Sequence, residues 1–297
     1  MNKPILKASG LTKKFGEVQA LKEVNLELKK GKVTVFLGEN GAGKTTTLKI
    51  ILGFLFPDTG KVEKIEAKLR LGYVPEQPVL FPWLKGREIL ALTGKIYGLR
   101  QVEIDKKISD LVSLLSFDPT QLERRVQTYS PGNQKKMAYL QNLLIDPELL
   151  IVDEPFSSLD PIAIKRIRDI FFNFKREGRT LFISSHLISE AEKLADEVII
   201  IKKGKTLLQV DWSEFRRERV YLKIKKETLA SKIVFERWPD SRFSGDYLEN
   251  FVLKNEWKEL FVSLEEKNKL AGLEEIEVSQ PDLETFFLFW IGNQVLN

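Results

Sequence analysis

Short apolar runs bounded by glycines alternate with helix-period segments through the first two thirds of the chain, a pattern typical of a layered α/β protein. Residues 33–37, Val-Thr-Val-Phe-Leu, predict a buried strand. Residues 44–52 predict the helix that follows, with Leu48, Ile51 and Leu52 facing the core. The eight residues GENGAGKT, which begin at position 38, join the two elements, so the order is strand, loop, helix.

A second unit of the same kind is predicted from residue 149 onward. Residues 149–152 form an apolar run, Pro161 suits the first turn of a helix, and residues 180–184 form another apolar run. The apolar positions of the helix recur at spacings of three and four: Ile164, Ile167, Phe171 and Phe174. Because such a crossover returns the chain parallel, Asp153 and His186 should both emerge at the C-terminal edge of one sheet, beside the loop at 38–45.

The rest of the first two thirds contains a helical insert and a closing hairpin. Residues 86–146 read as mostly helical, and four apolar residues within them keep a helical period: Ile104, Ile108, Leu111 and Leu115. Residues 198–201 and 206–210 are strand-like and flank Lys203-Gly204, which predicts a hairpin.

The pattern changes after residue 211, where four tryptophans and the strand-like segments 220–224 and 275–278 appear. A chain of 34.2 kDa is long enough for one large core or for two unequal domains. We favour two domains, residues 1–210 and a small α+β domain at 211–297. The segment from residue 279 onward predicts a terminal helix, and four of its residues fall on one helical face: Leu283, Phe286, Phe287 and Trp290. This face either packs in the core or forms a surface for a partner.

Composition narrows the classes of function and location. The sequence has no cysteine and one histidine, which excludes disulfides, thiol nucleophiles and metal sites rich in Cys or His. It has no run of 18 apolar residues and no apolar core of signal-peptide length near Met1, so we expect a cytoplasmic protein. Residues 1–209 carry 34 Lys and Arg against 25 Asp and Glu, a net charge of +9, whereas residues 210–297 carry 13 against 17, a net charge of −4. A basic first part suits a polyanion such as a nucleoside triphosphate.

The loop at 38–45 fits the phosphate-loop pattern of two glycines, a lysine and a hydroxyl at fixed offsets. Its three glycines let the backbone curl so that consecutive amides point at phosphates. Lys44 supplies a mobile positive charge, Thr45 should ligate Mg²⁺, and Thr46 should reach a phosphate oxygen. The predicted nucleotide-binding positions are Gly38, Glu39, Asn40, Gly41, Ala42, Gly43, Lys44, Thr45 and Thr46.

Two acids end the second apolar run. An unpartnered carboxylate is costly to bury, so a Mg²⁺ neighbour explains Asp153 at the end of a strand. Glu154, the next residue, would orient or deprotonate an attacking water. In the alternative interpretation, both acids are strand-end caps.

Five motifs in this order resemble the ATP-binding subunit of an ATP-binding cassette (ABC) transporter. They are GENGAGKTT from residue 38, YSPGNQ from 129, LLIVDEP from 149, SLD from 158, and Ser185-His186. The resemblance covers residues 1 to about 210. It implies a P-loop NTPase cassette with a mixed sheet and a helical insert, a need for ATP and Mg²⁺, and two such domains that hold two ATP molecules head to tail.

The resemblance also implies roles for residues outside the phosphate loop. Ser130 and Gly132 match the signature positions that touch the γ-phosphate held by the opposite chain. Asp160 matches the loop that passes between the two sites, and His186 matches the histidine that contacts the γ-phosphate. Phe15 stands where the family stacks an aromatic ring on adenine, although it could equally be a core residue.

The chain departs from the common family pattern at two places. The signature has Pro131 and Asn133 where glycine and glutamine are usual, so the amide donor at position 131 is lost. Aligned on Tyr73-Val-Pro75, Glu76 rather than Gln77 falls at the position of the Mg²⁺-sensing, permease-coupling glutamine. Both remain candidates.

The last segment, from Ser279 to Phe287, resembles the end of export-type cassettes that have separate permeases. We therefore expect an ATPase that dimerises around ATP, as a homodimer or with a paired cassette, and drives a membrane permease through the insert near Phe81-Pro-Trp83. This subunit would lie on the inner face of the cell membrane through the permease. One rival is a soluble cassette ATPase that acts on nucleic acid or a protein complex. Such proteins usually join two cassettes in one chain or insert long coiled coils, and this sequence shows neither. The other rival is a nonhydrolytic nucleotide-binding regulator, which Glu154 argues against. We expect no nucleic-acid partner.

Overall fold

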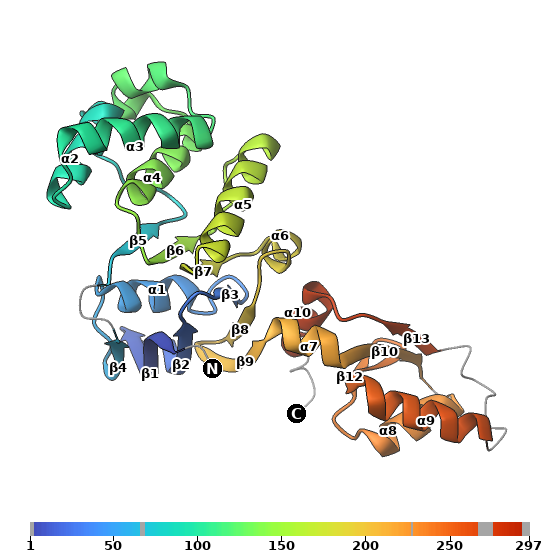
Figure 1. The fold of residues 1–297 in the computed structure, drawn as a ribbon. Coiled ribbons are helices and arrows are strands. Elements are labelled where there is room, and N and C mark those ends of the chain that lie inside the picture. Colours follow the sequence, from blue (N-terminus) through green and yellow to red (C-terminus); the bar gives the residue numbers. More distant parts are fainter. Residues whose placement is uncertain (1–2, 66–68, 227, 267–275, 293–297) are drawn as a thin grey trace. The chain divides into compact units, whose positions relative to one another are not determined.

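The computed structural model describes residues 3–65, 69–226, 228–266 and 276–292 (Figure 1). Contacts divide the chain into two compact units, residues 1–209 and residues 210–297. Within the described ranges, no helix has both the length and the apolar character needed to cross a membrane.

A six-stranded sheet forms the centre of the first unit. In spatial order its strands are β5 (Leu71–Val74), β6 (Leu149–Asp153), β7 (Thr180–Ser184), β3 (Val33–Leu37), β8 (Glu197–Lys202) and β9 (Lys205–Asp211). The first five are paired in parallel. Strands β8 and β9 are joined by Lys203 and Gly204, whose φ angles of 47° and 78° fit a tight hairpin turn. The strands predicted at 33–37 and 180–184 are confirmed at the same bounds, and those predicted at 149–152, 198–201 and 206–210 are confirmed with one or two more residues each.

A second, antiparallel sheet in the same unit has the order β2 (Val18–Lys29), β1 (Pro4–Phe15), β4 (Thr59–Lys64). Helix α1 (Lys44–Leu52) belongs to the same apolar cluster as this small sheet and one face of the large sheet. The rings of Phe36 and Phe182, on neighbouring strands β3 and β7, lie 5.4 Å apart in this cluster. Leu48 and Ile51 of α1 are buried as predicted, and Leu52 is half-buried.

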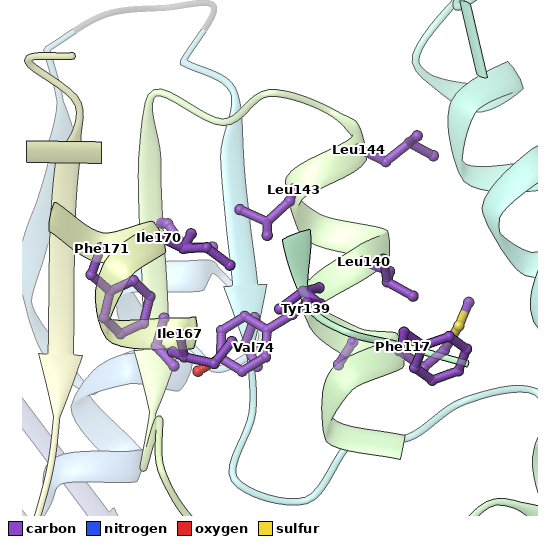
Figure 2. Packing of buried hydrophobic residues seen from close by; sticks show 14 of the residues in the cluster. Val74, Phe117, Tyr139, Leu140, Leu143, Leu144, Ile167, Ile170 and Phe171 are labelled. Atoms are coloured by element: carbon purple, nitrogen blue, oxygen red, sulfur yellow. The ribbon is translucent and has the colours of Figure 1, made fainter. Parts of the chain in front are cut away.

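The opposite face of the large sheet packs against α5 (Pro161–Arg176) and the helical insert. The insert consists of α2 (Gly86–Ile96), α3 (Gln101–Leu114), 3₁₀ turns at Pro119–Glu123 and Val126–Thr128, and α4 (Pro131–Leu144). The prediction of a mostly helical segment at 86–146 is therefore confirmed. Figure 2 shows how Tyr139 of α4 lies toward Phe171 of α5, with ring centroids 6.2 Å apart. Helix α4 therefore packs against α5, in an apolar cluster that also contains sheet residues such as Val74 and Val152.

The second unit is an α+β sandwich. Its antiparallel sheet has the order β11 (Arg242–Ser244), β12 (Tyr247–Leu253), β10 (Arg219–Lys225), β13 (Ile276–Ser279). With α8 (Leu229–Arg237) and α9 (Lys254–Glu266), the chain runs β-α-β-β-α-β, the ferredoxin-like arrangement. Leu248 and Ile224, which pair across β12 and β10, belong to the apolar cluster that also contains α8 and α9 residues.

The other face of this sheet carries aromatic rings. Tyr221 and Phe251 pair across β10 and β12, and Phe251 contacts Phe215 of α7 (Trp212–Glu218) and Phe286 of α10 (Leu283–Ile291). Ring centroids in these three contacts are 5.1–5.6 Å apart. The sheet is therefore covered on both faces within this unit.

The terminal helix differs from its predicted position. We expected it from residue 279, but strand β13 runs to Ser279 and α10 begins at Leu283, because the Asp282 side chain caps it by accepting a hydrogen bond from Thr285 N at 2.8 Å. The buried face agrees with the prediction at Leu283 and Phe286 but differs at its other positions. Its members are Leu283, Phe286, Phe289 and Ile291, whereas the predicted Phe287 and Trp290 are half-buried.

Candidate functional site

The loop between β3 and α1 has the backbone that its glycines predict. Gly41 and Gly43 have φ angles of 78° and 107°, in the left-handed region that favours glycine. A Cβ at Gly38 would stand 2.6 Å from the carbonyl oxygen of Ile201, so only glycine fits between the loop and β8. The loop is thus held close to the sheet edge at one end and is curled at the other.

Lys44, the first residue of α1, turns back over this loop. Its Nζ donates to the carbonyl oxygens of Gly38 at 2.6 Å and Glu39 at 3.2 Å, and the residue is buried. Of the other predicted positions, Glu39, Asn40, Gly41 and Thr45 are exposed, Gly43 and Thr46 are half-buried, and Ala42 is buried. The loop therefore offers an exposed rim above a buried ammonium, the arrangement that a phosphate group requires.

Asp153 lies at the end of β6, next to Thr45. Its Oδ1 accepts a short hydrogen bond from the Ser184 hydroxyl at the end of β7, and its Oδ2 lies 3.3 Å from Thr45 Oγ1, the donor. A hydroxyl and a carboxylate oxygen thus meet at the edge of the phosphate loop. Mg²⁺ prefers oxygen ligands and commonly keeps waters and substrate phosphates among them, so this pair fits a magnesium site completed by a nucleotide.

Glu154 contacts His186. Its Oε2 accepts from the His186 backbone N at 3.1 Å and lies 2.7 Å from Nδ1. Burial raises the pKa of the Glu154 carboxyl, and the contacts with His186 oppose this rise. A carboxylate with a raised pKa is better suited to accept a proton from water than an ordinary glutamate.

The two residues differ in exposure. The His186 side chain is 59% exposed and the Glu154 side chain 11%. If Nδ1–H donates to the carboxylate, Nε2 is left on the open side for a ligand. Glu154 also has a φ of 50°, a conformation uncommon outside glycine, which is typical of functional sites.

Phe15, at the end of β1, is not a core residue. Its side chain is 49% exposed, and Lys13 Nζ lies 5.8 Å from the ring centroid. The core alternative is therefore wrong, and the ring has a face available for stacking.

The signature residues surround a different cavity. Ser130 caps α4, its hydroxyl accepting from Asn133 N at 3.3 Å, and Pro131 begins the helix. A Cβ at Gly132 would stand 2.9 Å from the Ser158 carbonyl oxygen, so this loop packs closely on the 158–160 segment. The cavity, of about 480 Å³, is lined by Ser130, Pro131, Gly132, Asn133, Lys136, Ser158 and Asp160.

Asp160 caps α5 at the rim of this cavity. Its Oδ1 accepts from Ala163 N at 2.8 Å, and its Oδ2 lies 3.8 Å from Lys136 Nζ. The bond from the Ala163 amide, followed by the charge of Lys136, lowers the pKa of Asp160. No phosphate-loop residue is among the residues that line this cavity, so within one chain the signature and the phosphate loop form separate surfaces.

Glu76 and Gln77 line a larger cavity of about 920 Å³ together with Thr45 and Asp153. Both side chains are exposed, and both remain candidates for the magnesium-sensing position. Tyr73 lines the same cavity, and burial, followed by the charges of Asp153 and Glu76, raises the pKa of Tyr73 to about 12.

The sequence pattern does not point to two residues of this region. Ser184 reads only as the end of a strand, although its hydroxyl donates to Asp153. Lys135 has no motif that marks it, yet it is 1% exposed and its Nζ donates to three backbone carbonyls near the site. Burial lowers the pKa of Lys135 to about 8, and the charges of Asp153, Glu76 and Glu154 limit the fall.

Comparison with known proteins gives the same family throughout. The model of the ABC transporter family matches residues 21–157. An uncharacterized ABC transporter ATP-binding protein of Methanocaldococcus jannaschii is 36% identical over 220 residues, 74% of this chain and 82% of that protein. The bacitracin transport ATP-binding protein of Bacillus licheniformis is also 36% identical, over 73% of this chain and 74% of its own.

Solved structures agree with the sequence relatives. The structure of an ATP-binding subunit of an ABC transporter superposes with a TM-score of 0.64 and 29% identity. It covers 72% of this chain and 92% of that chain. The predicted fold class, a mixed α/β cassette with a helical insert, is confirmed.

Proposed function

This chain belongs to the ATP-binding proteins of ABC transporters, which are ATPases, and from that premise we propose that two copies, or one copy and a paired cassette, close around ATP to drive a separate membrane permease. One observation carries the proposal. Thr45, Asp153 and the Glu154–His186 pair lie together at the carboxyl ends of neighbouring parallel strands. Nucleotides bind at this edge in open α/β sheets.

Within one chain, the phosphate loop holds the triphosphate. The loop amides and the N-terminus of α1 face the phosphates, and Lys44, which now bonds Gly38 and Glu39 carbonyls, exchanges these for phosphate oxygens. Thr45 and Asp153 would hold Mg²⁺ with Glu76 or Gln77, and the bound ion would neutralise charge on the β- and γ-phosphates. The exposed ring of Phe15 stacks on adenine.

Glu154 orients the attacking water and accepts its proton. The raised pKa of its carboxyl supports this role, and the bond to His186 Nδ1 fixes its direction. His186 places Nε2 toward the γ-phosphate, and its exposure leaves it accessible to a ligand. The strand-end-cap alternative gives no role to the exposed imidazole beside Glu154.

The partner chain completes the site. Ser130, Gly132 and Asp160 line a cavity apart from this chain's own phosphate loop, which suits residues that act on a nucleotide held by another copy. Pro131 has no N–H to offer a phosphate. Lys136 lines the same cavity and adds a positive charge there.

The permease would dock beside the larger cavity. Residues of the 75–80 segment line it together with Thr45 and Asp153, so a bound helix of the permease would contact the segment that reaches the metal site. Phe54 and Val79 line this cavity and are exposed, and the exposed rings of Phe81 and Trp83, which follow the 75–80 segment, lie 5.8 Å apart. Exposed apolar patches on soluble proteins mark interaction sites. The membrane-facing location of the subunit follows from this docking.

The second unit, residues 211–297 by sequence, is proposed as an accessory domain. The export-type grouping rests on the likeness of its last segment, from Ser279 to Phe287. The alternative of a soluble ATPase on nucleic acid gains no support from the relatives, which are named transporter ATP-binding proteins.

The test of the proposal is the mass of the Glu154→Gln variant. If two chains sandwich ATP, this variant should bind ATP, fail to hydrolyse it and sediment as a dimer with MgATP but as a monomer without nucleotide. Glu154→Gln combined with Lys44→Ala is the matched control and should stay monomeric. An unchanged mass at high protein and MgATP concentrations would contradict the sandwich.

A further inference from the structure

Helix α4 carries three polar side chains on one face, behind the signature residues at its start. Lys135, Tyr139 and Asn142 follow at spacings of four and three, so they lie in one row along the helix. Each of them bonds to the main chain of another segment. The helix is therefore fastened to the core by polar bonds as well as by apolar packing.

Lys135 makes the most connections. Its Nζ donates to the carbonyl oxygens of Pro75 at 2.8 Å, Glu76 at 3.3 Å and Asp153 at 3.0 Å. An ammonium has three hydrogens, and three acceptors surround this one. Pro75 and Glu76 follow strand β5, whereas Asp153 ends β6, so one side chain joins the two segments that approach the metal position.

The other two side chains reinforce this connection. Tyr139 Oη donates to the Pro155 carbonyl oxygen at 2.9 Å, just beyond Glu154. Asn142 Oδ1 accepts from Tyr73 N, within β5, at 2.8 Å. Together with Lys135, they attach α4 to both strand ends.

A space-filling role does not explain Lys135. The residue is 1% exposed, and a cation out of water is costly unless its hydrogens and charge are satisfied, so an apolar side chain would fill the space at lower cost. What the lysine adds is a set of donors to three carbonyls in two different segments. Partners that orient metal-binding groups from behind commonly act in this way.

We propose that Lys135 is a positioning residue that holds the 75–77 segment in register with Asp153, and so couples the signature at the start of α4 to this chain's own magnesium position. The proposal rests on the function proposed above, which assigns Asp153 and Glu76 or Gln77 to Mg²⁺. Displacement of Ser130 by the partner's nucleotide would move α4, and Lys135 would transmit that movement to the metal-binding segment.

Three variants test the proposal in the full chain. Lys135→Met removes all three donors and keeps the apolar stem, and Lys135→Arg keeps charge and several donors. Lys107→Met is the matched control, because Lys107 Nζ donates to the Leu144 carbonyl at the far end of α4, at 3.1 Å. For each variant we would measure kcat, the Mg²⁺ concentration for half-maximal turnover, the melting temperature, and the affinity for ADP with and without Mg²⁺.

A positioning role predicts a selective defect. Lys135→Met should lower kcat and raise the half-saturating Mg²⁺ concentration by about 10- to 100-fold, the usual effect of losing a group behind a metal ligand. Its affinity for metal-free ADP should stay within about twofold of wild type, because the phosphate loop is untouched. Lys135→Arg should recover much of the loss, and Lys107→Met should match wild type in every measurement.

Two outcomes would overturn the inference. One is a Lys135→Met protein with a lower melting temperature but wild-type kcat and Mg²⁺ dependence per folded molecule, which would mean a structural role only. The other is an equal loss of metal-free ADP binding and of turnover. If Lys135→Met does not fold, Tyr139→Phe, which removes only the bond to Pro155, should give the same selective defect in milder form, and wild-type kcat in that variant would count against the coupling.

Asp153→Asn separates this inference from the proposed function. If Asp153→Asn shifts the Mg²⁺ dependence and Lys135→Met does not, only the role of Lys135 is wrong. If Asp153→Asn leaves the Mg²⁺ dependence unchanged, the magnesium assignment itself fails.

Discussion

Replacement of Glu154 by glutamine should separate turnover from stability. The glutamine keeps an oxygen where Oε2 accepts from His186 N, but it cannot take a proton from water. Loss of a general base costs about 10²- to 10⁴-fold in rate, which corresponds to about 2.7–5.4 kcal/mol of transition-state stabilisation. Binding of MgATP should change little, since the contacts made before the transition state remain.

The stability of the variant should move in the opposite direction from its activity. Burial raises the pKa of the Glu154 carboxyl, so the folded state disfavours its charged form relative to the unfolded chain. At neutral pH the ionised carboxyl therefore costs stability, and a neutral glutamine removes that cost. The melting temperature of Glu154→Gln should equal or exceed that of wild type, as is common where an active site is strained.

The assay is steady-state ATP hydrolysis beside differential scanning calorimetry, with Glu103→Gln as the control. Glu103 lies on α3 in an exposed pair with Arg100, so its replacement should leave kcat and the melting temperature unchanged. A kcat for Glu154→Gln within about tenfold of wild type would refute the assignment, because a general base contributes about a hundredfold or more. A fall in melting temperature large enough to explain the lost activity would refute it equally.

Two further predictions concern Glu154 and His186, and a third concerns the aromatic cluster of the second unit. As pH falls, protonation of the Glu154 carboxyl removes the general base, and the pKa of this carboxyl is raised above 4.5, the ordinary pKa of glutamate. The acid limb of the kcat–pH profile should therefore lie above pH 4.5, and a limb at or below pH 4.5 would contradict the assignment. His186→Ala should lose ATP hydrolysis by orders of magnitude while its melting temperature is preserved. In the untagged Glu154→Gln protein, the single imidazole should give different NMR shifts with MgATP and with MgADP. Identical spectra at saturation would mean that His186 does not sense the γ-phosphate. Phe286→Ala should destabilise the second unit by about 3–5 kcal/mol in urea unfolding, because the buried ring contacts those of Phe215 and Phe251, and a loss below about 1 kcal/mol would show that the cluster repacks.

The parts of the fold that the sequence predicted are those with the strongest local signals. Strands β3, β6 and β7 are buried along their whole length, so each reads as an uninterrupted apolar run. The phosphate loop is fixed by glycines that no other residue could replace, as at Gly38. A topological rule for parallel crossovers then placed Asp153 and His186 at the same sheet edge without any knowledge of contacts.

What the sequence did not predict depends on tertiary contacts. The β2-β1-β4 sheet has several register shifts, which blur the alternation that marks a strand. Lysine is almost never fully buried without partners, so no local signal distinguishes Lys135 from the exposed lysines of the chain. The face of α10 differs in part from the predicted one because helical spacing does not determine which side of a helix docks, and here the contacts of Phe286 and Phe289 with Phe251 set it.

Pro131 has a consequence for the timing of the transport cycle. In the proposed dimer, a proline at the first turn of α4 would offer one amide fewer to the partner's nucleotide, which would shorten the lifetime of the closed state. The same ring fixes φ in advance, so less chain entropy would be lost on closure and association would be faster than for a flexible glycine. The cassette should therefore close and reopen quickly, trading residence time in the closed state for a higher frequency of cycles.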